Sequence, residues 1–160
     1  MRTIERLLDE YGSSHQNPTN KLIHWICVPA ITFSLLGLLW SIPSEFIQGF
    51  FPSSIQEYVN FASLFIILAL LYYFRLSIAL AIGMIFISFA LLWTCYAIDK
   101  YLELPLWLFS IIVFVLAWIG QFFGHNIEGK KPSFLKDVQF LLIGPIWLLH
   151  FIYKKTGIPY

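Results

Sequence analysis

The chain has 160 residues, of which 59% are hydrophobic and only 12% are charged, and its mean hydropathy is +0.76. A soluble domain of this length could not bury that much apolar surface, so we expect lipid to be its solvent. The net charge of +1 comes without a dense basic run, which argues against a nucleic-acid partner.

The first apolar residues of the chain recur at the spacing of a helix face. Ile4, Leu7, Leu8 and Tyr11 follow the i, i+3, i+4, i+7 pattern, and Gly12 closes it. This pattern predicts a short amphipathic, interfacial helix over residues 3–12 that lies on the membrane surface.

Four longer apolar segments follow, and we expect all four to be transmembrane helices. Three of them reach about 20 residues, the length that crosses a hydrocarbon core of about 30 Å at about 1.5 Å rise per residue. The second segment is shorter but unbroken, and its final Tyr72 and Tyr73 suit a membrane interface. The predicted spans cover residues 22–42, 59–74, 76–98 and 104–124.

The last apolar segment contains Gly144 and Pro145. The ring of Pro145 removes a hydrogen-bond donor and clashes with the preceding turn, so we expect a broken or re-entrant helix over residues 138–153. Residues 1–160 are therefore predicted to form a single all-α integral membrane domain.

Lysine and arginine are unevenly distributed among the predicted loops. The positive-inside rule makes the side of the N-terminus cytoplasmic. Lys154 and Lys155 join that side if the last helix turns back, so both termini are expected there. The absence of a retention signal favours a bacterial inner membrane over the endoplasmic reticulum. The cations expected inside are Arg2, Arg6, Lys21, Arg75, Lys130, Lys131 and Lys136, with Lys100 outside.

Three histidines fall at predicted helix ends on that cytoplasmic side. Asn17 followed by Pro18 is typical of a helix start, with a capping residue and then a proline at the first position. His24 then lies two turns into the helix and His15 just before its cap. His125 lies at the cytoplasmic exit of the fourth span.

Amide and acidic residues share helix faces with these histidines. Asn17 and Asn20 align with His24, while Gln121 and Glu128 align with His125. We expect the amides of Asn17, Asn20 and Gln121 to support the histidine rings. Gly120 and Gly124, four residues apart, predict a close approach to a neighbouring helix.

These histidines predict a metal site, because a neutral imidazole binds divalent iron, zinc or copper. A single histidine at a helix end is more often an interfacial hydrogen-bonding residue, but three on one side of a membrane favour a functional site. His150 becomes a fourth ligand only if the last helix turns back, and Glu128 could complete the site. Histidines with a carboxylate and open positions are typical of non-haem Fe(II) oxygenases, whereas a saturated four-ligand zinc site would be structural.

Two histidine-bearing segments and the Gly144-Pro145 pair resemble a family of small membrane proteins that includes 2-hydroxy fatty acid dioxygenases. The resemblance covers essentially the whole chain and supports His15, His24 and His125, whereas His150 lies outside these segments. Cys27 stands where the family pattern has glycine, a difference expected to affect packing rather than chemistry. The segments are YGSSHQNPTNKLIHWICVP over residues 11–29 and QFFGHNIEGKKP over residues 121–132.

The resemblance implies an Fe(II)-dependent dioxygenase that oxidatively shortens 2-hydroxy fatty acids by one carbon, a step of alpha-oxidation, with O2 as co-substrate. His15, His24 and His125 would be its catalytic metal ligands. A 2-hydroxy carboxylate can chelate a metal through two oxygens while its acyl chain lies among apolar helices. Lys130 or Lys131 could meet the carboxylate, although anchoring at the membrane surface is their more ordinary role.

Two functions of other classes remain open. The chain could be a non-enzymatic lipid-binding or transport module, or a structural protein in which zinc ties the N-terminal helix to the fourth span. The glycine pair could also serve a homo-oligomer. Only four histidines are present, which excludes the eight-histidine di-iron hydroxylases, and no Gly-rich dinucleotide fingerprint supports hydride transfer.

Overall fold

The computed structural model describes residues 3–131 and 139–160, and all regular secondary structure within them is helical. The all-α prediction is therefore confirmed for this part of the chain. Arg2, Pro132, Lys136 and Val138, four residues that the sequence-based expectations included, lie outside the described residues.

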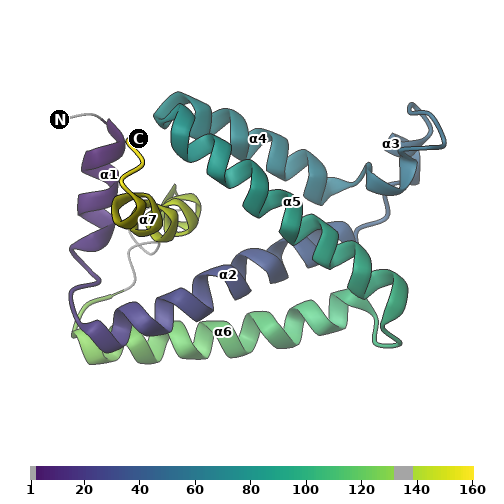
Figure 1. Cartoon of the computed structure of the whole chain (residues 1–160). Helices are drawn as coiled ribbons and strands as arrows, with labels where there is room; N and C mark the ends of the chain where they lie inside the picture. The colour runs from purple at the N-terminus through teal and green to yellow at the C-terminus, as the bar shows by residue number, and fades with distance from the viewer. Residues whose placement is uncertain (1–2, 132–138) are drawn as a thin grey trace.

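Four long helices form two antiparallel pairs (Figure 1). In one pair α2 (Pro18–Trp40) runs along α6 (Leu106–Glu128), and in the other α4 (Phe61–Leu76) runs along α5 (Ile78–Tyr101). Among the described residues, α2, α5 and α6 are long and apolar enough to cross a membrane. Helix α4 has only 16 residues, so a fourth span stays a prediction.

Polar capping residues fix where these helices begin. The Asn17 side chain accepts hydrogen bonds from the backbone N–H groups of Thr19 and Asn20, which confirms the predicted helix start. Asn60 caps α4 and Ser77 caps α5 in the same way. The predicted spans lay within a few residues of the observed helices, because apolar runs locate a helix whereas its caps set the ends.

The α2–α6 pair is closely packed through glycine. A Cβ atom at Gly120 would lie 2.7 Å from Sγ of Cys27, and one at Gly124 would lie 2.5 Å from Oδ1 of Asn20. This confirms the predicted close approach. The neighbour is α2 of the same chain, so the glycine pair is used within the chain.

Helix α7 (Gln139–Thr156) is continuous, so the predicted break at Gly144 and Pro145 is wrong. A proline inside a helix removes only one backbone donor, the one that would bind the carbonyl of Leu141, and the helix continues on both sides of it. Gly144 serves packing instead, because a Cβ atom there would lie 3.1 Å from the hydroxyl of Tyr11.

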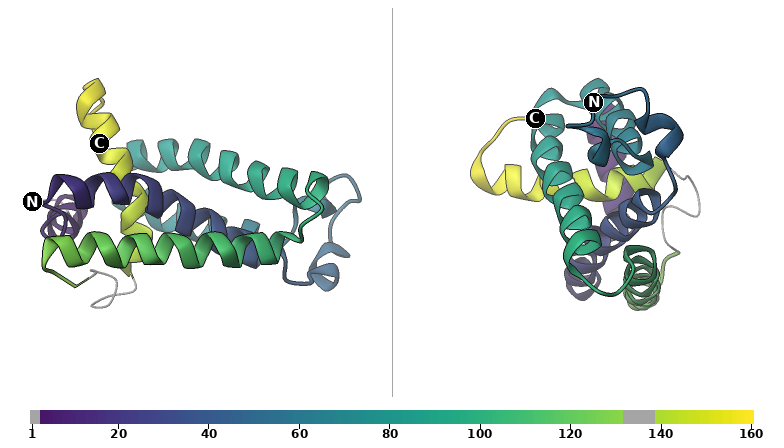
Figure 2. Two further views of the ribbon diagram at one scale, coloured as in Figure 1. Left: turned by 90° about the horizontal axis from the view of Figure 1, so that it is seen from below. Right: turned by 90° about the vertical axis from the view of Figure 1, so that its right-hand side faces the viewer.

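The orientation of α7 is also different from the expected re-entrant turn. Figure 1 shows α7 end-on between the two helix pairs, and Figure 2 shows it running across them. It contacts both α2 and α5 at the end of the bundle where the described chain begins and ends. A helix that lies crosswise to the long helices neither spans with them nor turns back beside them.

Helix α1 (Thr3–Gly12) has the predicted bounds but a different environment. Its apolar residues Ile4, Leu7, Leu8 and Tyr11 are all buried in one cluster with residues of α7, such as Ile143 and Trp147. The apolar face of α1 is therefore covered by protein rather than by lipid, which corrects the expectation of a helix lying on the membrane surface.

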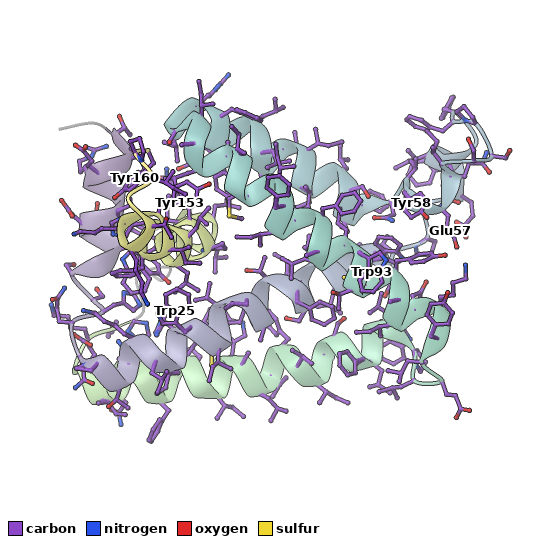
Figure 3. The ribbon with its side chains drawn as sticks, viewed as in Figure 1. Trp25, Glu57, Tyr58, Trp93, Tyr153 and Tyr160 are labelled. Carbon is purple, nitrogen blue, oxygen red and sulfur yellow. The ribbon has the colours of Figure 1, made fainter. Side chains whose placement is uncertain are left out.

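The two ends of the bundle differ in charge and are both marked by aromatic residues. Arg6, Lys21, Arg75 and Lys130 belong to the α1–α7 end, whereas Lys100 ends α5 at the opposite end. Figure 3 shows Trp25 near the first end and Tyr58 and Trp93 toward the other. Exposed Trp and Tyr side chains are typical of membrane interfaces, and this separation fits helices that cross from one interface to the other. The side that faces the cytoplasm stays a prediction.

Candidate metal centre

Three histidines converge at the α1–α7 end of the bundle. His15 comes from the connection between α1 and α2, His24 from the second turn of α2, and His125 from the last turn of α6. Their exposed fractions are 1%, 0% and 4%. One ring nitrogen from each lies within 4.8 Å of the others, so these side chains could hold a metal ion.

Backbone carbonyls fix the protonation of two of the rings. Nδ1 of His15 lies 2.6 Å from the carbonyl oxygen of Tyr11, and Nδ1 of His24 lies 2.8 Å from that of Asn20. A carbonyl can only accept, so we assign the proton of each neutral ring to Nδ1. The Nε2 atom of each ring then carries a lone pair.

These two lone pairs face each other, because Nε2 of His15 lies 2.8 Å from Nε2 of His24. Two lone pairs at this distance repel unless a cation lies between them. A shared proton is disfavoured, because burial and then the neighbouring His24 lower the pKa of His15 from 6.5 to about 3. A metal ion would remove the repulsion between the two lone pairs, since two nitrogens bound to one ion at about 2.0–2.1 Å lie about 3 Å apart.

His125 supplies the third nitrogen and has an unsatisfied atom of its own. Its ring centroid lies 4.9 Å from those of His15 and His24. Its Nδ1 atom is buried and has no hydrogen-bond partner in the described structure. Buried polar atoms of this kind normally have a partner. A bound metal ion, or another ligand of that ion, would give this nitrogen one, so the three residues fit a metal ion.

Glu128 lies beside the cluster but is occupied by other contacts. Its two carboxylate oxygens accept hydrogen bonds from the backbone N–H groups of Gln16 and Asn17, each at 2.8 Å, and from the side-chain amide of Asn20 at 3.1 Å. Glu128 therefore ties the end of α6 to the connection that carries His15. It is not among the three residues whose ligand atoms converge.

The three amide residues that were expected to support the histidine rings have different roles in the structure. Asn17 caps α2, and Asn20 supports His24 through its backbone carbonyl rather than its side chain. The Asn20 amide instead donates to the carbonyl of Ser14 at 3.3 Å, which fixes the residue before His15. Gln121 lines a small cavity together with His125.

The lysines and His150 lie outside the cluster. Nζ of Lys130 donates a 2.6 Å hydrogen bond to the carbonyl of Ser13, so it fastens the end of α1, and Lys131 is exposed. His150 lies on α7, where Nδ1 is hydrogen-bonded to the hydroxyl of Tyr160. His150 is not among the residues whose ligand atoms converge with those of the other three histidines.

Two aromatic residues near the cluster were missed by the sequence analysis. The Tyr11 ring stacks on His15, with centroids 4.4 Å apart and planes 14° apart. The Trp147 ring, from α7, has its centroid 5.1 Å from that of His15. The four-residue spacing of Tyr11 and His15 was a usable signal, because it lets a helix-end carbonyl meet the ring. No such signal existed for Trp147, since its approach to His15 depends on the orientation of α7.

Comparisons with known proteins agree with the family resemblance seen in the sequence. Residues 1–156 match the Mpo1-like family, described as "2-hydroxy-palmitic acid dioxygenase Mpo1-like". Over 152 residues the chain is 29% identical to 2-hydroxy-palmitic acid dioxygenase MPO1 of Saccharomyces cerevisiae, which covers 93% of this chain and 79% of the yeast protein. No solved structure matches the chain.

Proposed function

Because this chain belongs to the Mpo1-like family, we propose that it is a membrane-bound dioxygenase that uses O2 to shorten 2-hydroxy fatty acids by one carbon. The activity resides at the centre formed by His15, His24 and His125. The observation that carries the proposal is the 2.8 Å approach of two Nε2 atoms whose Nδ1 atoms both face carbonyl oxygens. A cation bound where the third histidine also converges would remove the repulsion between these two nitrogens.

The proposed cofactor is Fe(II), held by the three imidazoles. Bound iron supplies the binding and reduction of O2, which zinc, having no redox chemistry, does not. The Tyr11 and Asn20 carbonyls keep the Nε2 atoms of His15 and His24 free to bind the metal.

The charge of this centre suits an anionic substrate. Three neutral imidazoles leave the charge of a divalent ion uncompensated in a buried position, which is unfavourable without a counter-charge. The carboxylate of a 2-hydroxy fatty acid would supply it, and the adjacent hydroxyl would add a second oxygen. Gln121, in the cavity wall beside His125, would donate its amide hydrogens to these oxygens.

Aromatic side chains keep the centre away from bulk water. The rings of Tyr11 and Trp147 lie against His15, and all three side chains are nearly fully buried. Exclusion of water strengthens charge interactions and protects reactive species from side reactions. These two residues therefore enclose and orient His15 and do not themselves react.

The proposal is tested by oxygen uptake. The full chain in lipid nanodiscs is loaded anaerobically with Fe(II) or with Zn(II), and O2 is then supplied with 2-hydroxypalmitate or palmitate. We expect uptake only with iron and the 2-hydroxy acid, together with a fatty acid one carbon shorter. Binding of the 2-hydroxy acid without uptake would contradict the proposal and favour a lipid-binding module. Tight zinc retention without iron binding would favour a structural metal site.

A further inference from the structure

Two neighbouring cavities lie inside the bundle, and one of them borders the histidine cluster. The smaller one, of about 40 Å³, is bordered by His125 and Gln121. The larger one, of about 150 Å³, lies deeper among α2, α4, α5, α6 and the first half of α7. The two cavities are adjacent, because both are lined by Ile31, Thr32, Trp118 and Leu141.

The wall that α6 contributes changes from polar to apolar along its length. Four residues of one helix face, spaced three or four apart, line this space over about 16 Å of the helix axis. From the metal centre inward they are His125, Gln121, Trp118 and Phe114.

The wall that α2 contributes is apolar beside the deeper cavity. Ile31 and Leu35 are apolar, and Thr32 between them donates its hydroxyl to the carbonyl of Val28 at 2.9 Å, which satisfies its polar group within the helix. The two cavities together therefore have one polar end, at the histidines, and one apolar end in the interior of the bundle.

This polarity matches a molecule with a small oxygen-rich head and a single apolar tail. A cavity of 40 Å³ holds about three water molecules, and a 2-hydroxy carboxylate has three oxygens. An apolar cavity of 150 Å³ is about the size that holds a six-carbon ring. Leu141 lines both cavities and is 38% exposed, so one wall reaches the outside of the bundle.

We propose that the paired cavities form the acyl-chain site, with the head of a 2-hydroxy fatty acid beside His125 and Gln121 and its tail passing Trp118 into the apolar cavity. This inference rests on the proposed function and assigns the tail to particular helices. Trp118 marks the boundary between head and tail, and the apolar cavity encloses about the first six carbons after the head. The remainder of a long chain continues past Leu141 toward the bilayer.

Photo-crosslinking tests the placement of the tail without requiring turnover. A 2-hydroxypalmitate that carries a diazirine on its eighth carbon is bound anaerobically to the iron-loaded chain in nanodiscs and irradiated. We expect labelling of Thr32, Phe114 or Trp118. Labelling confined to outward-facing residues of α5, such as Phe86 and Phe89, which are 72% and 75% exposed, would overturn the proposal.

A cavity-filling variant provides the second measurement. Ala69 is a buried residue that lines the apolar cavity, so Ala69→Leu places three more carbons there. Ala90→Leu makes the same change on the exposed face of α5 and is the matched control. We expect Ala69→Leu to lower crosslinking, and kcat/KM for 2-hydroxypalmitate, by about tenfold. The kcat/KM for 2-hydroxybutyrate should stay unchanged, because this acid has almost no tail.

The outcomes separate the two proposals. Crosslinks in the cavity without oxygen uptake would leave the acyl-chain site intact and refute the dioxygenase. Oxygen uptake with crosslinks only outside the bundle would support the dioxygenase and refute the acyl-chain site. An equal loss of activity with both substrates in Ala69→Leu, at an unchanged melting temperature, would also refute the acyl-chain site.

Discussion

The carboxylate of Glu128, the last residue of α6, lies 2.8 Å from the backbone nitrogen of Asn17, the residue that caps α2. A second oxygen of the same carboxylate binds the N–H of Gln16. The two residues after His15 are thus fixed to the helix that carries His125. Glu128 acts on the centre through the backbone, as a positioning residue.

Removal of Glu128 is expected to weaken metal binding more than folding. Glu128→Ala leaves these N–H groups without their charged acceptor, which costs about 1–3 kcal/mol of unfolding free energy, and it frees the connection that holds His15. The free energy of iron binding should fall by more than the free energy of unfolding does. Both losses should be smaller in Glu128→Gln, which keeps one acceptor oxygen. Metal titration and thermal unfolding measure the two effects, with the exposed Glu103→Ala as control. Unchanged iron affinity in Glu128→Ala would show that the contact only stabilises the fold.

The four histidines provide a matched test of the metal centre. We expect His15→Ala, His24→Ala and His125→Ala each to lose bound iron, because each removes one of the three converging nitrogens. His150→Ala should keep about one iron per chain, since its ring is bonded to Tyr160. Elemental analysis of protein extracted from membranes gives the result, and inserted protein levels show that the variants are folded. Loss of iron in His150→Ala alone would contradict the assigned centre.

The distance between α2 and α6 is expected to control iron binding at the same centre. Gly124→Ala places a Cβ atom 2.5 Å from Oδ1 of Asn20, so α6 must move away from α2 and take His125 with it. Overpacking of this kind costs about 1–3 kcal/mol, and iron affinity should fall as well. Gly49→Ala is the control, because the nearest atom to its new Cβ would lie 3.8 Å away. Equal melting temperatures and iron affinities for the two variants would contradict this reading of the α2–α6 contact.

The low pKa of His15 makes the stability of the metal-free chain depend on pH. Burial, and then His24, hold this pKa at about 3, against 6.5 for an unperturbed histidine. Between these values the unfolded chain binds more protons than the folded one. The contribution of His15 is therefore fully present above about pH 6.5 and is lost as the pH falls toward 3.

The measurement is the melting temperature of the metal-free chain from neutral to acidic pH. It should fall less steeply with acidification in His15→Leu than in the wild type, because the leucine cannot take up a proton. A steeper fall in the variant would show that His15 is not held neutral by its surroundings.

Both chain ends are expected on the same side of the membrane as the histidine centre. The structure brings α1, the end of α7 and the cations Lys21 and Lys130 to that end of the bundle, and the positive-inside rule makes it cytoplasmic. Impermeant thiol reagents should label Glu103→Cys from outside intact cells and Tyr160→Cys only after lysis. Cys27 and Cys95 are buried and serve as the unlabelled background. Labelling of Tyr160→Cys in intact cells would overturn the assigned orientation.

The sequence alone predicted those features of the fold that depend on residues close to one another in the chain. Asn17 and Pro18 predicted the start of α2 because a cap acts within one turn, and Gly120 with Gly124 predicted a close helix contact because the pattern belongs to one helix face. The convergence of His15, His24 and His125 followed from placing helix ends on one side of a membrane. These inferences need only helix geometry and the direction of each crossing.

The errors arose where a distant contact decides the outcome. The break at Pro145 was predicted from a local rule, but the adjacent Gly144 packs closely against Tyr11 and Val28 and α7 stays continuous. Glu128 was expected as a possible ligand because it shares a face with His125, and the hydrogen-bond partners of its carboxylate lie more than 100 residues earlier in the chain. No spacing rule within one helix predicts such partners.

The distribution of the three histidines along the chain also sets the time at which the centre can exist. His15 and His24 leave the ribosome about 100 residues before His125, an interval of about 5–20 s at ordinary rates of synthesis. During that interval the first two rings have no third partner and α2 has no α6 beside it. All three nitrogens can hold a metal ion only after α6 lies beside α2, so bound iron would report that this helix pair has formed.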